Sequence, residues 1–285
     1  MSIGTKVRGV VQIVRPELPL AAGLCVAIGE FVALRAIPPM ETMALGAFCG
    51  FLLSGSAMAT NDYFDLEVDR MNTPWRPLPA GLLRPGEAMG LGLLMGVAGL
   101  AAAWALNPAA FVAALGIWIL GFLYNWRIKA HGVWGNLIVG LSVAMTFVIG
   151  GVGVGQPWNG RVWLFGLIAF VFDLAEEIAG DAMDAEGDRV RGSRSVAIVW
   201  GKRAALSISA VLLAIMIALS WVPMVTGEYG LSYTVPMLIA DVLIVVFGVR
   251  LLRSGTPQEG RWAMRALYIS GSLALFAFLV GSYLG

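Results

Sequence analysis

The apolar residues of this chain gather in long, nearly unbroken runs rather than in the alternating or amphipathic patterns of a soluble fold. A helix of about 20 apolar residues crosses a hydrocarbon layer of roughly 30 Å. The pattern therefore predicts an all-α polytopic membrane protein, with one integral membrane domain over residues 1–285. Nine transmembrane helices are expected, at about 18–36, 40–60, 86–106, 108–125, 133–154, 161–180, 204–222, 233–252 and 263–284.

Composition agrees with this class and excludes several others. Hydrophobic residues make up 59% of the chain and charged residues 13%, against about 45–50% and about 25% in soluble domains. A net charge of +1 gives nucleic acid no attraction, and the single histidine, His131, excludes a multi-histidine metal centre. Cys25 and Cys49 are expected to be free thiols buried in apolar helices. Nothing in the sequence calls for an obligate protein partner.

The basic residues predict how the helices are oriented. Seventeen of the 19 Lys and Arg residues fall before the first run or in every second link, and only Arg35 and Arg161 fall on the opposite side. Cytoplasmic segments carry the excess of basic residues. We therefore expect the N-terminus and the two long charged links, about 61–85 and 181–203, to be cytoplasmic, and the C-terminus to be outside.

Both charged links begin with the same acidic pattern, D-x-x-D-x-x-x-D, which makes a short internal pseudo-repeat at residues 62–69 and 181–188. At about 100° per residue, positions i, i+3 and i+7 lie within roughly 60° of one another around a helix. Each pattern is thus expected to present three carboxylates on one helix face. They are Asp62, Asp65 and Asp69 in the first link and Asp181, Asp184 and Asp188 in the second.

Carboxylates crowded in this way repel one another unless cations neutralise them. Hard oxygen ligands suit Mg²⁺, which proteins hold through a few carboxylates together with substrate phosphates. We therefore expect two acidic helix ends that face each other across a membrane-embedded cavity and bind a diphosphate through Mg²⁺, with two ions expected. Arginines nearby are suited to phosphate contact, among them Arg70, Arg76 and Arg194.

Residues 61–81 and 181–201 resemble the two signatures of the UbiA superfamily of intramembrane prenyltransferases. Residues 124–136 resemble the Tyr/Lys segment of that superfamily, and Arg15-Pro16 resembles the opening of its first helix. The resemblance covers nearly the whole chain. It implies nine helices around a central cavity that opens to lipid, with Mg²⁺, a prenyl diphosphate and a lipophilic acceptor as its ligands.

The resemblance also implies roles for individual residues. Asn61 and the six aspartates would form the metal and diphosphate site, while Arg76 and Lys129 would hold the departing diphosphate. The family often spaces its Tyr and Lys by four, whereas Tyr124 and Lys129 are five apart with Arg127 between them. Either cation is therefore a candidate for phosphate contact. Further substrate-binding candidates are Arg15, Tyr124, Arg127, Arg70 and Arg194.

Acidic residues also fall within the apolar runs, where ionisable groups are costly and often functional. Asp173 and Glu177 are four residues apart on the helix that leads to Asp181, and we expect them to line the acceptor side. Glu30 has no assigned role. For Asp241 a structural hydrogen bond is the preferred interpretation.

The chemistry expected of these parts is prenyl transfer. Mg²⁺ and cationic side chains would stabilise the charge on the leaving diphosphate, and burial would protect the allylic cation from water. Residues 178–188 look most like the archaeal-type branch, which attaches a geranylgeranyl group to geranylgeranylglyceryl phosphate in ether-lipid synthesis. Aromatic or tetrapyrrole acceptors, as in quinone-type and chlorophyll-type synthases, a terpene cyclase on the same scaffold, and a transporter remain as alternatives.

Overall fold

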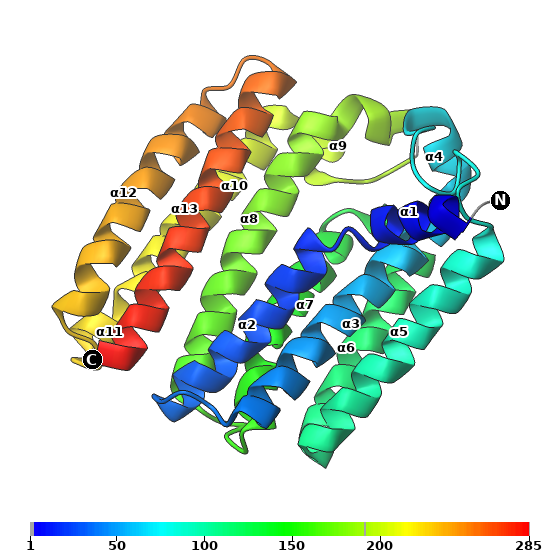
Figure 1. The fold of residues 1–285 in the computed structure, drawn as a ribbon. Coiled ribbons are helices and arrows are strands. Elements are labelled where there is room, and N and C mark those ends of the chain that lie inside the picture. Colours follow the sequence, from blue (N-terminus) through cyan, green and yellow to red (C-terminus); the bar gives the residue numbers. More distant parts are fainter. Residues whose placement is uncertain (1–2, 191, 285) are drawn as a thin grey trace. The chain divides into compact units, whose positions relative to one another are not determined.

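The computed structural model describes residues 3–190 and 192–284, with the side chains of all of these except residues 3, 130 and 186–190. Every regular element in the described part is helical (Figure 1). In chain order the elements are α1 (Ile3–Val14), α2 (Glu17–Leu34), α3 (Met40–Phe64), α4 (Leu66–Asn72), α5 (Pro85–Leu106), α6 (Pro108–Trp126), η1 (Ile128–His131), α7 (Val133–Gly153), α8 (Gly160–Val190), α9 (Val196–Val199), α10 (Lys202–Ser220), α11 (Val222–Val225), α12 (Leu231–Leu252) and α13 (Pro257–Leu284).

The long helices lie where the apolar runs predict them. Eight of the described helices are long and apolar enough to cross a membrane. The sequence predicts nine spans, and the difference arises at α8, which is 31 residues long. Asp173, Glu176 and Glu177 lie within the stretch of α8 predicted to be the sixth span. These carboxylates make α8 too polar to be recognised from its composition alone.

The short helices α1, α4, η1, α9 and α11 were not predicted, and the first two lie next to α3. The first, α1, lies across the end of α3 rather than alongside it (Figure 1). Its Ile13 is fully buried and its Gly9 packs on Leu82 and Leu83, whereas Val7 and Val11 are exposed. The second, α4, continues from α3 after a break at Asp65.

The described helices form two compact units. The first unit contains residues 1–33, 38–129 and 145–159, and so includes α1 to α6 and the last part of α7. Here Trp118 of α6 donates a hydrogen bond to Ser56 of α3 (2.9 Å), and Ser56 donates to the Gly92 carbonyl of α5 (2.6 Å). Hydrogen bonds of this kind hold helices together where water is absent.

In the same unit α2 packs closely against α3 and α7 through glycines. A Cβ atom at Gly29 would lie 2.1 Å from the Phe147 carbonyl oxygen, and one at Gly150 would lie 2.1 Å from that of Val26. Glu30 is fully buried at this crossing, and neither of its carboxylate oxygens has a hydrogen-bond partner among the described residues. Its Oε1 occupies the space that a side chain at Gly46 would need.

The second unit contains residues 34–37, 130–144 and 160–285, and so includes the start of α7 and all of α8 to α13. Within it α12 and α13 run side by side (Figure 1). Asp241 of α12 is 4% exposed and accepts hydrogen bonds from Ser220 and from the Trp221 indole (2.9 Å). The structural interpretation of Asp241 is confirmed.

Candidate active site

The first acidic cluster lies where α3 ends. Asp62 is in the last turn of α3, Asp65 is the residue between α3 and α4, and Asp69 is on α4. The sequence predicts that the three share one face of a single helix, and this is wrong in detail. The helix breaks at Asp65, whose φ of −86° and ψ of 0° end α3, so the third carboxylate is carried by a separate short helix.

Asp62 is the most deeply buried member of this cluster, with a side chain that is 1% exposed. The Arg15 guanidinium donates a hydrogen bond to Asp62 Oδ1 over 2.5 Å. The other carboxylate oxygen, Oδ2, is buried and has no hydrogen-bond partner within the described part of the chain. A buried charge is unfavourable unless it is paired, and Arg15 provides that pairing from 47 residues away.

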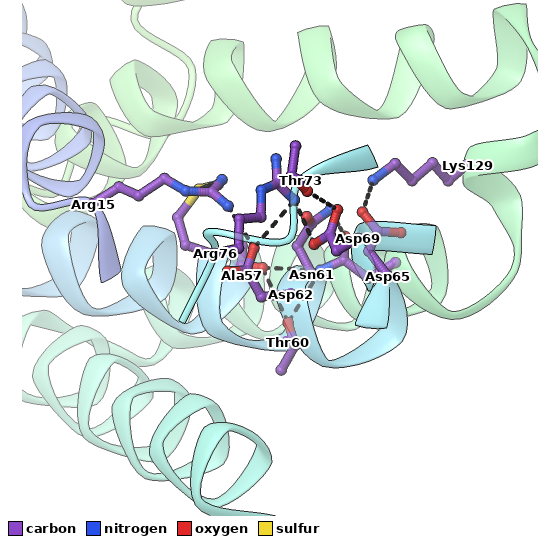
Figure 2. A network of polar contacts seen from close by, with 12 residues as sticks. Arg15, Ala57, Thr60, Asn61, Asp62, Asp65, Asp69, Thr73, Arg76 and Lys129 are labelled. Carbon is purple, nitrogen blue, oxygen red and sulfur yellow. Dashed lines mark hydrogen bonds and ion pairs between the residues drawn. The ribbon is translucent and has the colours of Figure 1, made fainter. Parts of the chain in front are cut away.

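Asp69 is 2% exposed and is held from two sides (Figure 2). Arg76 Nη1 lies 2.7 Å from Asp69 Oδ2 and 3.7 Å from Asp62 Oδ1, so this one guanidinium serves both carboxylates. The Thr73 hydroxyl donates to Asp69 Oδ1 over 2.8 Å. The turn after α4 thus brings Arg76 back over the cluster.

Asp65 is paired with Lys129, which η1 carries (Figure 2). Arg127 is exposed and lies over the Trp126 ring, 6.0 Å from its centroid. Of the two candidate cations, Lys129 is the one that pairs with Asp65. Asn61 lies next to the cluster in the last turn of α3, and the side-chain amides of Asn61 and Asn125 lie 3.1 Å apart.

Two further candidates lie in the same unit. Arg70 donates to Glu67 over 2.8 Å, and both side chains are exposed, which is typical of a surface ion pair. Tyr124 is half-buried in the last turns of α6.

The second acidic cluster lies on one continuous helix, as predicted. Asp181 and Asp184 are on α8, where Asn136 donates to Asp181 (2.9 Å) and Arg261 donates to Asp184 (2.7 Å). The Arg261–Asp184 pair is exposed on both sides. Asp188 is also in α8, but its side chain lies outside the described residues.

Three predicted candidates lie farther along the second unit. Asp173 and Glu177 are on the membrane part of α8, and Asp173 Oδ2 is buried without a hydrogen-bond partner among the described atoms, as is Glu176 Oε1. Arg194 precedes α9, and its side chain is exposed while its carbonyl packs against Gly132.

The first cluster fits a divalent cation chemically. All its acidic groups are hard oxygen donors, as Mg²⁺ prefers, and Asp62 Oδ2 is a buried acceptor that still lacks a partner. Across the described residues, however, no three acidic, His or Cys side chains are gathered as metal ligands. The carboxylates instead face cationic side chains, so the residues suit the metal while their arrangement in this structure is that of ion pairs.

Several contacts of the clusters were not assigned from the sequence. Thr73 is one helical turn beyond Asp69, and that spacing was a usable signal. Arg261 is 77 residues from Asp184 and Asn136 is 45 residues from Asp181. No periodic pattern records either pairing, although Asn136 closes the segment 124–136 that resembles the superfamily.

Solved structures of similar fold cover nearly the whole chain. A chain from a study of the biosynthesis of digeranylgeranylglyceryl phosphate synthase in membranes matches with a TM-score of 0.83 and 26% identity, over 98% of this chain and 99% of that one. A UbiA homologue from Archaeoglobus fulgidus, bound to DMAPP and Mg²⁺, matches with a TM-score of 0.70 and 21% identity, over 96% and 99%. The second likeness concerns the fold alone.

Relatives found by sequence also match over nearly the whole length of both chains. The digeranylgeranylglyceryl phosphate synthase of Thermococcus sibiricus is 35% identical over 95% of this chain and 96% of its own. That of Halobacterium salinarum is 36% identical over 96% and 97%. The profile of the UbiA prenyltransferase family matches residues 22–279. With its paired aspartate clusters, its helical membrane fold and these matches, the chain belongs to the UbiA prenyltransferase family.

Proposed function

We propose that this prenyltransferase moves a geranylgeranyl group from its diphosphate to the free hydroxyl of geranylgeranylglyceryl phosphate, in a Mg²⁺-dependent reaction. The observation that carries the proposal is the buried first cluster, in which Asp62 and Asp69 are 1% and 2% exposed and lie beside Arg15 and Arg76. Relatives named digeranylgeranylglyceryl phosphate synthase support this choice of acceptor.

The aspartates of each cluster would hold Mg²⁺, with two ions in the protein, and Asn61 would add a polar contact to the first cluster. These aspartates are Asp62, Asp65, Asp69, Asp181, Asp184 and Asp188. Bound there, Mg²⁺ would supply positive charge to the leaving diphosphate. The Arg76 guanidinium lies within reach of two carboxylates, and its place at the cluster suits it to meet the oxygens of a diphosphate in the same way. Lys129, which lies on η1, would also contact the diphosphate oxygens.

The residues of the chain would then separate the reacting groups from water. The charge on the departing diphosphate is stabilised by fixed cations, so ionisation of the allylic carbon–oxygen bond becomes feasible in a site that excludes water. The acceptor hydroxyl would attack the allylic carbon and lose its proton to a weak base, for which the departed diphosphate is available. Asp173 and Glu177 are proposed to line the acceptor side, where Asp173 carries a buried oxygen without a hydrogen-bond partner among the described residues.

The proposed location is the cell membrane, with the acidic clusters on the cytoplasmic side. Contacts within each unit agree with this topology, since they join segments predicted for the same side. Lys6 pairs with Glu87, which lies at the predicted cytoplasmic end of the span 86–106, and Lys129 pairs with Asp65, both predicted cytoplasmic. Arg35 donates to the Glu228 carbonyl (2.8 Å), and both are predicted outside.

The test is a transfer assay with purified protein, labelled geranylgeranyl diphosphate and a panel of acceptors. With geranylgeranylglyceryl phosphate and Mg²⁺ we expect a product that contains both fragments, no turnover in EDTA, and recovery when Mg²⁺ is restored. Diphosphate release should be slow without acceptor, because the buried site protects the cation. Transfer only to aromatic acceptors would overturn the acceptor assignment, and a cyclised hydrocarbon at full rate without acceptor would identify a cyclase.

A further inference from the structure

Each carboxylate of the first cluster already has a cationic partner in the protein itself. Arg15 lies 2.5 Å from Asp62, Arg76 lies 2.7 Å from Asp69, and Lys129 is paired with Asp65. The three negative and three positive formal charges of these side chains sum to zero. The first cluster is therefore electrically balanced before any ligand arrives.

These pairs differ from surface ion pairs because their carboxylates are buried. Asp62 and Asp69 are almost completely buried, while Arg15 and Arg76 are 26% and 30% exposed. A buried carboxylate that loses its partner keeps an uncompensated charge in a medium of low polarity, which is strongly unfavourable. A divalent cation that enters the cluster alone adds two positive charges to a balanced set, so it competes with Arg15, Arg76 or Lys129 for a carboxylate.

Arg15 shows that this pairing is built into the backbone. It is the residue that links α1 to α2, with a φ of +49°, in the left-handed region that side chains with a Cβ rarely adopt. From this position its guanidinium reaches both Asp62 Oδ1 and the Met58 sulfur (3.7 Å). The chain thus holds an unfavourable backbone conformation at the residue that pairs with the most buried acid of the first cluster.

We infer that Arg15, Arg76 and Lys129 are internal counter-ions that make the first cluster bind Mg²⁺ and a diphosphate as one unit and each of them weakly alone. When both arrive, the carboxylates turn to the metal and the released cations turn to the diphosphate, so every charge keeps a partner. With either ligand alone, one set of charges is left unpaired. This inference rests on the proposed function only in that a diphosphate and Mg²⁺ are the ligands.

The experiment measures binding rather than turnover. Mg²⁺ and inorganic pyrophosphate are titrated separately and together by calorimetry, and a titration without protein corrects for the complex they form in solution. Coupling between two ligands is reciprocal. We expect each ligand to tighten the other by the same factor, within the range of roughly 5–150-fold that such coupling usually spans.

The decisive variant is Arg15→Gln. Because it removes the nearer of the two guanidinium groups that pair with Asp62, Mg²⁺ alone should bind several-fold more tightly than to the wild type, while Mg²⁺ with pyrophosphate should bind more weakly. If Arg15 had only a structural role, its replacement would weaken the binding of Mg²⁺ both alone and with pyrophosphate. If Arg15→Gln does not fold, Lys129→Gln frees Asp65 and should give the same opposite shifts. Lys6→Gln, which breaks the exposed Lys6–Glu87 pair of the same unit, should change neither.

Two results would overturn the inference: equal binding of Mg²⁺ with and without pyrophosphate, or weaker binding of Mg²⁺ alone to Arg15→Gln. The failure of the proposed function looks different. If coupling is found but no product forms from geranylgeranylglyceryl phosphate, then the counter-ion inference stands and the acceptor assignment fails. If product forms without coupling, the function stands and the inference fails.

Discussion

At the scale of single residues, the chemistry depends on which charges are buried. Asp62 and Asp69 are removed from solvent, whereas Asp184 and its partner Arg261 are exposed. An exposed pair contributes little because water and salt screen it. The first cluster is therefore where a substitution should have the larger electrostatic effect, and the residue that contacts two of its carboxylates is Arg76.

We predict that Arg76→Gln lowers kcat far more than it raises KM. The charge on the leaving diphosphate is greatest in the transition state, so a fixed cation stabilises that state most. Loss of one preorganised donor to a developing anion costs on the order of 10²–10³-fold in kcat. Steady-state kinetics at saturating Mg²⁺ measure the two constants. Arg84→Gln is the control, because Arg84 is exposed at the start of α5. A rise in KM at constant kcat would contradict this prediction, because it would mean that Arg76 stabilises the bound substrate and the transition state equally.

The aspartates of both clusters were predictable because their spacing and their place at helix ends are local features of the sequence. Their partners were only partly predictable. Arg76 lies seven residues from Asp69, but Arg15 and Lys129 reach their carboxylates across 47 and 64 residues. Long-range pairing of this kind depends on helix packing. No periodic pattern records it.

At the scale of helices, close approach is set by residues without side chains. The crossing of α2 with the last part of α7 leaves no room for a Cβ atom at Gly29 or Gly150, and in both cases the obstacle is a backbone carbonyl, which cannot rotate away. Small residues allow membrane helices to pack in this way.

We therefore predict that Gly150→Ala destabilises the protein, by about 1–3 kcal/mol, the usual effect of overpacking. Its Cβ would lie 2.1 Å from the Val26 carbonyl oxygen, so the helices must move apart. Unfolding in mixed detergent micelles gives the free-energy difference. Gly116→Ala on α6 is the matched control, since nothing lies within 4 Å of its Cβ position, and alanine should there be neutral or mildly stabilising. Equal stability of the two variants would contradict the packing argument.

The long helices follow from apolar length, so the sequence predicted their bounds to within four residues, except that α8 runs ten residues beyond its expected span and α13 begins six residues before its own. The length of apolar runs did not predict two features. The helix α1 is only 12 residues long and carries Lys6 and Arg8 among its apolar positions. The break at Asp65 has no Pro or Gly to mark it, and the aspartate spacing fits an unbroken helix equally well.

At the scale of the whole molecule, the distribution of basic residues predicts a fixed orientation in the membrane. We expect a cysteine at Thr226, before α12, to be labelled from outside intact cells, and one at Ser193, before α9, to be protected. The background should have Cys25 and Cys49 replaced by alanine, since both are free thiols. Labelling of the cysteine at position 193 from outside, with the one at 226 protected, would invert the topology and place the acidic clusters on the outer face.

The acidic content of α8 has a consequence for how the chain enters the membrane during synthesis. The insertion machinery tests each emerging segment for hydrophobicity, and an aspartate near the centre of a helix costs about 2.5–3.5 kcal/mol there, whereas a leucine or phenylalanine gains only about 0.3–0.6 kcal/mol. Asp173 lies close to the middle of the expected span, and Glu176 and Glu177 follow it. Such a segment partitions poorly into lipid by itself. Its stable insertion therefore depends on helices made later, above all α10 and α13, against which it packs, so this helix becomes stably inserted only when the end of the chain has been translated.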